Sequence, residues 1–164
     1  MKRVLSFLLM GALCLCFAVP FSAAETVPQQ NDKTIISESE ENLDNGFTIE
    51  TVISVPKTDE GIHFNASTQT KTANATSTVR HDGDWVGSIT LTANFGYNGS
   101  FSWVNRMSTS HSVASGWTYE NERTWKSGRT AKMSASMSKK IAFIPITTVD
   151  PSVSITCSPT GQIS

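Results

Sequence analysis

The chain has few cysteines, and their positions limit the kind of domain it can form. Of its three cysteines, Cys14 and Cys16 lie in the N-terminal apolar run and Cys157 lies near the end. Removal of the N-terminal run would leave Cys157 alone, and a single cysteine cannot form an internal disulfide. The sequence therefore excludes a small extracellular scaffold held together by disulfides.

The motifs of common catalytic and metal sites are also missing. The chain has no Gly-x-Ser-x-Gly sequence, no glycine-rich phosphate loop and no cysteine–histidine pair at a recognisable spacing. Its three histidines, His63, His81 and His111, are too far apart in sequence to show the spacing of paired metal ligands. We therefore expect no enzyme, no cofactor and no metal site.

The first 24 residues have the parts of a secretory signal peptide. Lys2 and Arg3 form a basic start, residues 4–19 form an apolar run, and small residues ending at Ala24 follow. We expect cleavage after Ala24; an uncleaved anchor is the alternative, because the run is nearly long enough to span a bilayer. The sequence predicts a secreted, extracellular or cell-surface protein with no stable membrane anchor after cleavage.

Charge is divided unevenly along the rest of the chain. Residues 25–60 hold nine acidic and two basic residues, whereas residues 61–164 hold five acidic and nine basic residues. Six of the bases lie in one stretch without an acid: Arg123, Lys126, Arg129, Lys132, Lys139 and Lys140. This asymmetry indicates either an acidic segment folded onto a basic face or a basic face that binds an anionic partner.

Composition divides the exported chain into a leader and a domain. Residues 25–46 are polar and acidic without a sustained apolar period, which favours a flexible acidic leader; a short helix over residues 35–43 is the alternative. Residues 47–164 alternate between apolar and polar positions, with turn signals roughly every ten residues. This pattern predicts one all-β domain, an antiparallel meander that forms a sandwich or an open barrel.

The clearest predicted hairpin covers residues 85–107. Apolar side chains alternate along its first arm, which places them on one face of a strand. These residues are Trp85, Ile89, Leu91, Ala93 and Phe95. A three-residue loop, residues 97–99, would pair Phe95 with Phe101 and place Gly99 in the left-handed conformation that such a loop needs.

This hairpin sets two further expectations. Trp85 and Trp103 fall on its apolar face, so we expect both in the core. Residues 68–80, just before it, carry mostly Ser, Thr, Ala, Asn and Gln, which favours an edge or lightly packed strand.

The closing segments carry a resemblance. Residues 138–146 read SKKIAFIPI and residues 153–161 read VSITCSPTG. Together with the signal peptide, the polar leader and the Ser/Thr-rich β domain, they resemble small secreted domains of unknown function from anaerobic Gram-positive bacteria. The resemblance covers residues 70–164; it implies an extracellular all-β domain and carries over no functional residue.

Aromatic and basic residues are concentrated between residues 117 and 132. Trp117, Tyr119, Arg123 and Trp125 share one strand parity, and arginine is rarely buried without a partner. The face is therefore either core or open to solvent, where flat rings can stack on sugars or contact arginine. The candidate ligand-binding residues are Trp117, Tyr119, Arg123, Trp125, Lys126, Arg129 and Lys132.

Two functional hypotheses follow. The first is a non-enzymatic binding module that contacts anionic cell-wall polymer or carbohydrate at the cell envelope, and the alternative is a secreted bacteriocin-like or membrane-active effector. Nucleic acid is not an expected partner, and the sequence leaves the oligomeric state open. An enzyme would depend on Glu120 and Glu122, alternate residues that we expect to form a solvated polar face.

Overall fold

The computed structural model describes residues 33–57, 68–142 and 144–164, which form β-strands joined by turns and contain no helix. The predicted signal peptide, the first part of the predicted leader and His63 lie outside the described residues. The strands are β1 Lys33–Asn42, β2 Phe47–Pro56, β3 Gln69–His81, β4 Asp84–Tyr97, β5 Ser102–Val113, β6 Trp117–Ser127, β7 Thr130–Ile141, β8 Ile144–Val149 and β9 Ser152–Thr156. Within the described ranges, no helix is long and apolar enough to cross a membrane.

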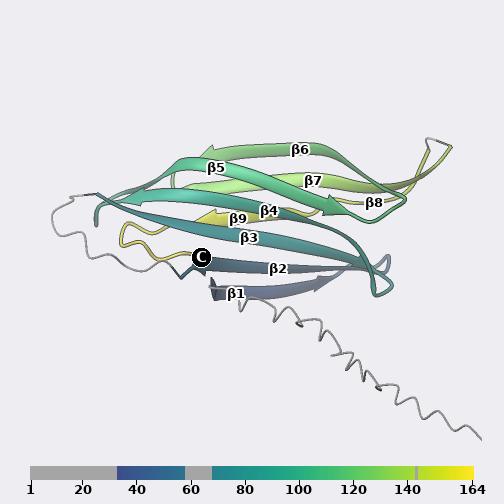
Figure 1. The fold of residues 1–164 in the computed structure, drawn as a ribbon, viewed down its shortest axis with the longest axis horizontal. Helices are drawn as coiled ribbons and strands as arrows, with labels where there is room; N and C mark the ends of the chain where they lie inside the picture. Colours follow the sequence, from purple (N-terminus) through teal and green to yellow (C-terminus); the bar gives the residue numbers. More distant parts are fainter. Residues whose placement is uncertain (1–32, 58–67, 143) are drawn as a thin grey trace, which may run out of the picture. The chain divides into compact units, whose positions relative to one another are not determined.

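The strands form two antiparallel sheets, which confirms the predicted all-β meander. One sheet has the order β1-β2-β3-β4-β5, and the other has the order β6-β7-β8. In the second sheet β9 also pairs with β7, along the first half of β7, whereas β8 pairs with its last residues. Figure 1 shows the sheets as two layers, in which β4 and β5 lie near β7 while β3 lies near β9. The domain is therefore a sandwich.

The core lies between the layers and follows the predicted alternation. On β4, Ile89, Leu91, Ala93 and Phe95 are fully buried. The facing sheet contributes Met133, Ala135 and Met137 from β7, with Val153, Ile155 and Cys157 at the C-terminal side. Each large side chain in this set contributes about 1.5–3 kcal/mol to the free energy of unfolding by leaving water.

The expected edge strand is the central strand of its sheet. β3 lies between β2 and β4, and its inward side chains Ala73, Ala75 and Ser77 are fully buried. Small residues suit this place because β9 approaches β3 from the other layer. On the outward face, hydroxyl and amide side chains bond across strands, as between Thr76 and Thr90 at 3.0 Å.

The β4–β5 hairpin is confirmed, but its predicted register is wrong. Tyr97 pairs with Ser102, so the turn has four residues, and Phe101 is 72% exposed instead of opposite Phe95. The Asn98 side chain accepts hydrogen bonds from the backbone N–H groups of residues 100 and 101, which stabilises this longer turn. Gly99 does adopt a left-handed φ of 86°.

The two tryptophans predicted in the core lie elsewhere. A bulge in the β3–β4 pairing lies next to Trp85, so Val86 is buried while Trp85 is 40% exposed. Trp103 is half-buried opposite Gly96, and its indole N–H donates to the side-chain oxygen of Asn105. In both cases a register shift changes the face on which the side chain lies.

Part of the predicted flexible leader is a strand. Residues 33–42 form β1 at the edge of the five-stranded sheet, and the helix alternative is also wrong. All ten side chains of β1 are exposed, so the strand is held by backbone pairing with β2 and gives no apolar periodicity in the sequence. The folded domain therefore includes residues on the N-terminal side of Phe47.

Candidate functional site

A β-bulge divides the aromatic and basic residues of β6 between two faces. Glu120 pairs with Ser136 on β7 and Arg123 pairs with Ser134, so two residues of β6 lie opposite one residue of β7. Asn121, inside the bulge, has a left-handed φ of 56°. Because an extra residue reverses the strand parity, the predicted common face of Trp117, Tyr119, Arg123 and Trp125 does not exist.

Before the bulge, the two aromatic rings face the core. Trp117 packs edge-on against Phe47, with ring centroids 5.9 Å apart. Tyr119 lies opposite the fully buried Met137. Both residues are partly buried and pack against the core, so neither ring lies on the solvent-facing side of β6.

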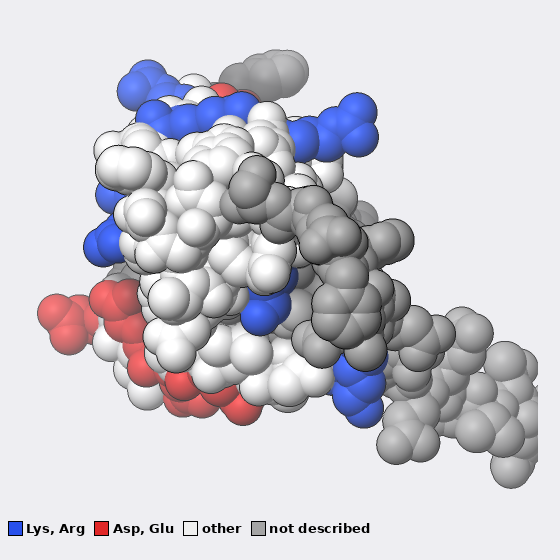
Figure 2. Space-filling view, turned by 90° about the vertical axis from the view of Figure 1, so that its left-hand side faces the viewer, with Lys and Arg blue, Asp and Glu red and all other residues white. Residues whose placement is uncertain are grey.

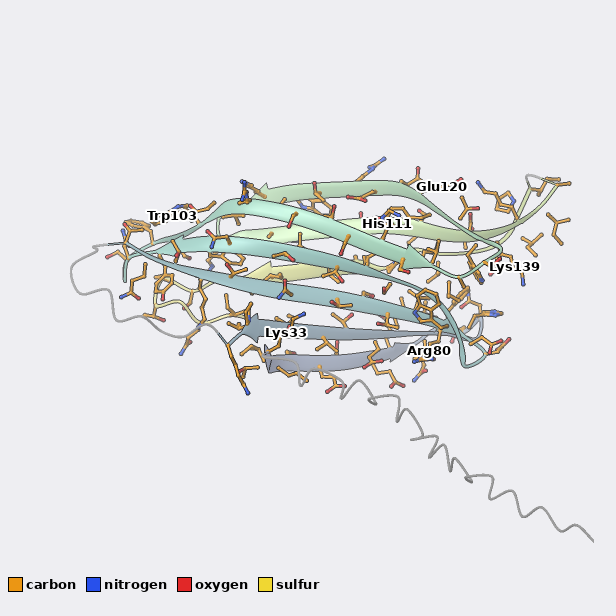
Figure 3. The ribbon with its side chains drawn as sticks, viewed as in Figure 1. Lys33, Arg80, Trp103, His111, Glu120 and Lys139 are labelled. Atoms are coloured by element: carbon orange, nitrogen blue, oxygen red, sulfur yellow. The ribbon has the colours of Figure 1, made fainter. Side chains whose placement is uncertain are left out.

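Tyr119 also belongs to a polar cluster that joins β5 to β6. Its ring stacks on His111 at 3.7 Å, and its hydroxyl donates to Glu122 at 2.8 Å. Thr109 donates to the other carboxylate oxygen of Glu122 at 2.7 Å. Figure 3 shows His111 where β5 runs beside the smaller sheet.

These contacts shift the pKa values of both acidic groups in the cluster. Hydrogen bonds from Thr109 and Tyr119 lower the pKa of Glu122 because they stabilise its charged form. Burial, together with the Glu122 carboxylate, raises the pKa of Tyr119. No motif in the sequence indicated this cluster, because Thr109 and His111 lie in a run of polar residues on a different strand.

The two carboxylates that alternate in the sequence have different partners. Glu120 forms an ion pair with Lys140 of β7, whereas Glu122 lies in the bulge and bonds to Thr109 and Tyr119. The two carboxylates therefore do not share one strand face as predicted, although both are accessible to solvent. Among the described residues, no group of three His, Cys, Asp or Glu side chains could hold a metal ion.

After the bulge, β6 presents an open face. Arg123 is exposed opposite Ser134, and Trp125 is 43% exposed opposite Lys132. A shallow, open depression in this region is lined by Glu122, Arg123, Thr124, Trp125 and Ser134. We call Arg123, Trp125 and Lys132 the open face.

The other two basic candidates lie at its borders. Arg129 is exposed in the turn between β6 and β7. Lys126 lies on the opposite parity, and its ammonium group donates to the backbone oxygens of Val104 and Asn105 at 3.5 and 3.0 Å. Lys126 therefore ties β6 to β5, and it is not part of the open face.

Searches against family models, curated proteins and solved structures found no match to this chain.

The acidic strand β1 and the basic stretch of β6 and β7 belong to different sheets. The acidic strand β1 pairs with β2 in the larger sheet, so it is not folded onto the basic residues of β6 and β7. In the view of Figure 2, several Lys and Arg lie at the top, on the side of the smaller sheet, while others lie lower on the molecule; most of the Asp and Glu lie toward the β1 side. In the described part of the chain, no carboxylate forms an ion pair with Arg123, Arg129 or Lys132.

Proposed function

We propose that this protein is a secreted, non-enzymatic binding module whose open face holds an anionic polysaccharide of the cell envelope. The observation that carries the proposal is the exposed ring of Trp125 beside two cations, with Arg123 two residues before it and Lys132 directly across the strand pair. An indole face can stack on a sugar ring, and the neighbouring cations can pair with acidic groups of the polymer.

The spacing of these groups suits a chain of sugars. Residues two apart on a strand are separated by roughly 6.6 Å, and directly paired residues by roughly 5 Å. Arg123 therefore neighbours Trp125 along the strand, and Lys132 neighbours it across the strand pair, each at a distance comparable to one sugar unit. The depression is shallow and open, which suits a polymer lying along the surface better than a small enclosed ligand.

A sedimentation assay with purified, lipid-free Gram-positive cell walls tests this proposal. We expect the protein to pellet with the walls and Trp125→Ala to weaken binding roughly tenfold, the loss typical of an important interface residue. Trp85→Ala is the matched control, since Trp85 is 40% exposed and lies on the other sheet. Equal losses in the two variants would contradict the proposal.

The charge contribution is tested in the same assay. Arg123→Gln should weaken binding, whereas Arg106→Gln, an exposed arginine on β5, should not. Raising the salt concentration should release the wild-type protein, because exposed charges are screened over about 10 Å at 0.1 M salt. Binding that persists unchanged in high salt would exclude an electrostatic contribution from this face.

A further inference from the structure

The hairpin formed by β7 and β8 exposes three large aliphatic side chains. Ile141 is 63% exposed, Ile144 is 67% exposed and Ile146 is 55% exposed. Ile141 and Ile144 are direct cross-strand partners, so their side chains are neighbours on the hairpin. Ile146 lies two residues after Ile144 on β8, at a shift in the pairing. Single exposed apolar residues are common on protein surfaces, but several on one short hairpin point to an interaction site.

The shape of this region limits what can cover it. Figure 1 shows the β7–β8 hairpin at the far end of the sandwich from the β4–β5 turn, where it runs out past the neighbouring strands. The isoleucines therefore lie on a projection and not in a groove. A narrow apolar projection suits a soft, deformable medium such as the boundary of a lipid bilayer.

The charges beside the isoleucines favour anionic headgroups. Lys139 is exposed and Lys140 is paired with Glu120, while residues 139–149 themselves contain no acid. Figure 3 shows Lys139 and Glu120 toward this end of the molecule, away from Trp103. A lysine next to an apolar tip can extend its stem along the apolar surface and place its ammonium group among lipid phosphates.

We propose that the β7–β8 hairpin inserts Ile141, Ile144 and Ile146 into the surface layer of a bilayer that contains anionic lipid. This membrane contact goes beyond the proposed polysaccharide site and does not depend on it. The open face, which includes Lys132, lies near the first residue of β7, whereas the isoleucines lie at the last residue of β7 and on β8. The two surfaces can therefore be tested separately.

Vesicle sedimentation with phosphatidylglycerol and with phosphatidylcholine tests the inference. We expect the protein to bind phosphatidylglycerol vesicles more tightly, and Ile141→Ser with Ile144→Ser to reduce binding roughly tenfold for each residue. Phe101→Ser is the matched control, because Phe101 is 72% exposed on the β4–β5 turn at the opposite end. Ile144→Leu should retain binding, because it keeps the apolar surface.

Three results would overturn the inference. They are a wild-type protein that binds neither vesicle, a double serine variant that binds like wild type, and an equal loss in Phe101→Ser. Light scattering adds a fourth: if the double variant only converts a dimer to a monomer, the isoleucines contact a second copy and not a lipid. Trp125→Ala should bind vesicles normally, which separates this test from the wall-binding test.

Discussion

Leu91 provides the most direct test of the two-sheet core. It lies in the middle of β4, is fully buried, and is paired with Ala75 on β3 and Thr109 on β5. Leu91→Ala removes three carbon atoms from a site that backbone pairing on both sides prevents from collapsing. Buried Leu→Ala changes cost about 3 kcal/mol, within a range of roughly 2–5 kcal/mol.

This loss translates into a measurable shift of the melting temperature. A folded domain of about 130 residues has an unfolding entropy of roughly 0.28 kcal/mol/K, so a loss of about 3 kcal/mol lowers Tm by about 10 °C. Circular dichroism at increasing temperature measures the shift. Ser110→Ala, an exposed position on β5, is the control and should lower Tm by less than about 2 °C. Similar shifts in the two variants would refute the packing of the β4 inner face.

Two further predictions concern ionisable groups. Hydrogen bonds from Thr109 and Tyr119 lower the pKa of Glu122 in the folded protein. Its contribution to stability is therefore fully present above the pKa of a glutamate in the unfolded chain, about 4.3. This contribution is lost as the pH falls through the lower pKa of the folded state. Urea titrations at pH values from about 6 to about 3 should show that acidification lowers the free energy of unfolding less in Glu122→Gln than in the wild-type protein. Cys157 is fully buried, and burial raises the pKa of its thiol. A chromogenic thiol reagent should therefore react with Cys157 in denaturant but not in the native protein, and the absorbance of the reaction measures this difference.

The sequence predicted strands best where the apolar period runs without interruption. The alternation of Ile89, Leu91 and Phe95 on β4, and of Met133 and Met137 on β7, matches the buried faces. The extra residues of the nearby bulges lie on the partner strands β5 and β6, so β4 and β7 keep their own alternation there. An uninterrupted alternation of apolar and polar residues predicts which face of a strand is buried, so these parts of the core could be predicted from the sequence alone.

The errors occur where the register shifts or where a strand has no apolar face. A bulge beside Trp85 and another in β6 reverse the parity of residues that otherwise fit the pattern. A bulge depends on backbone pairing with another strand, and the sequence of one strand does not show it. β1 was missed for a different reason, since all its side chains are exposed and its stability comes from backbone bonds to β2.

The bulge in β6 affects both the contact between the two sheets and the proposed binding surface. β6 is the edge strand of its sheet, so an extra residue there disturbs the pairing with β7 only, and asparagine is among the residues that tolerate the left-handed φ of Asn121. The bulge places Glu122 where Thr109 and Tyr119 bond to its carboxylate. It also turns Trp125 outward while Tyr119 stays against the core. One backbone irregularity therefore joins the two sheets at β5 and β6 and creates the exposed ring on which the proposed binding depends.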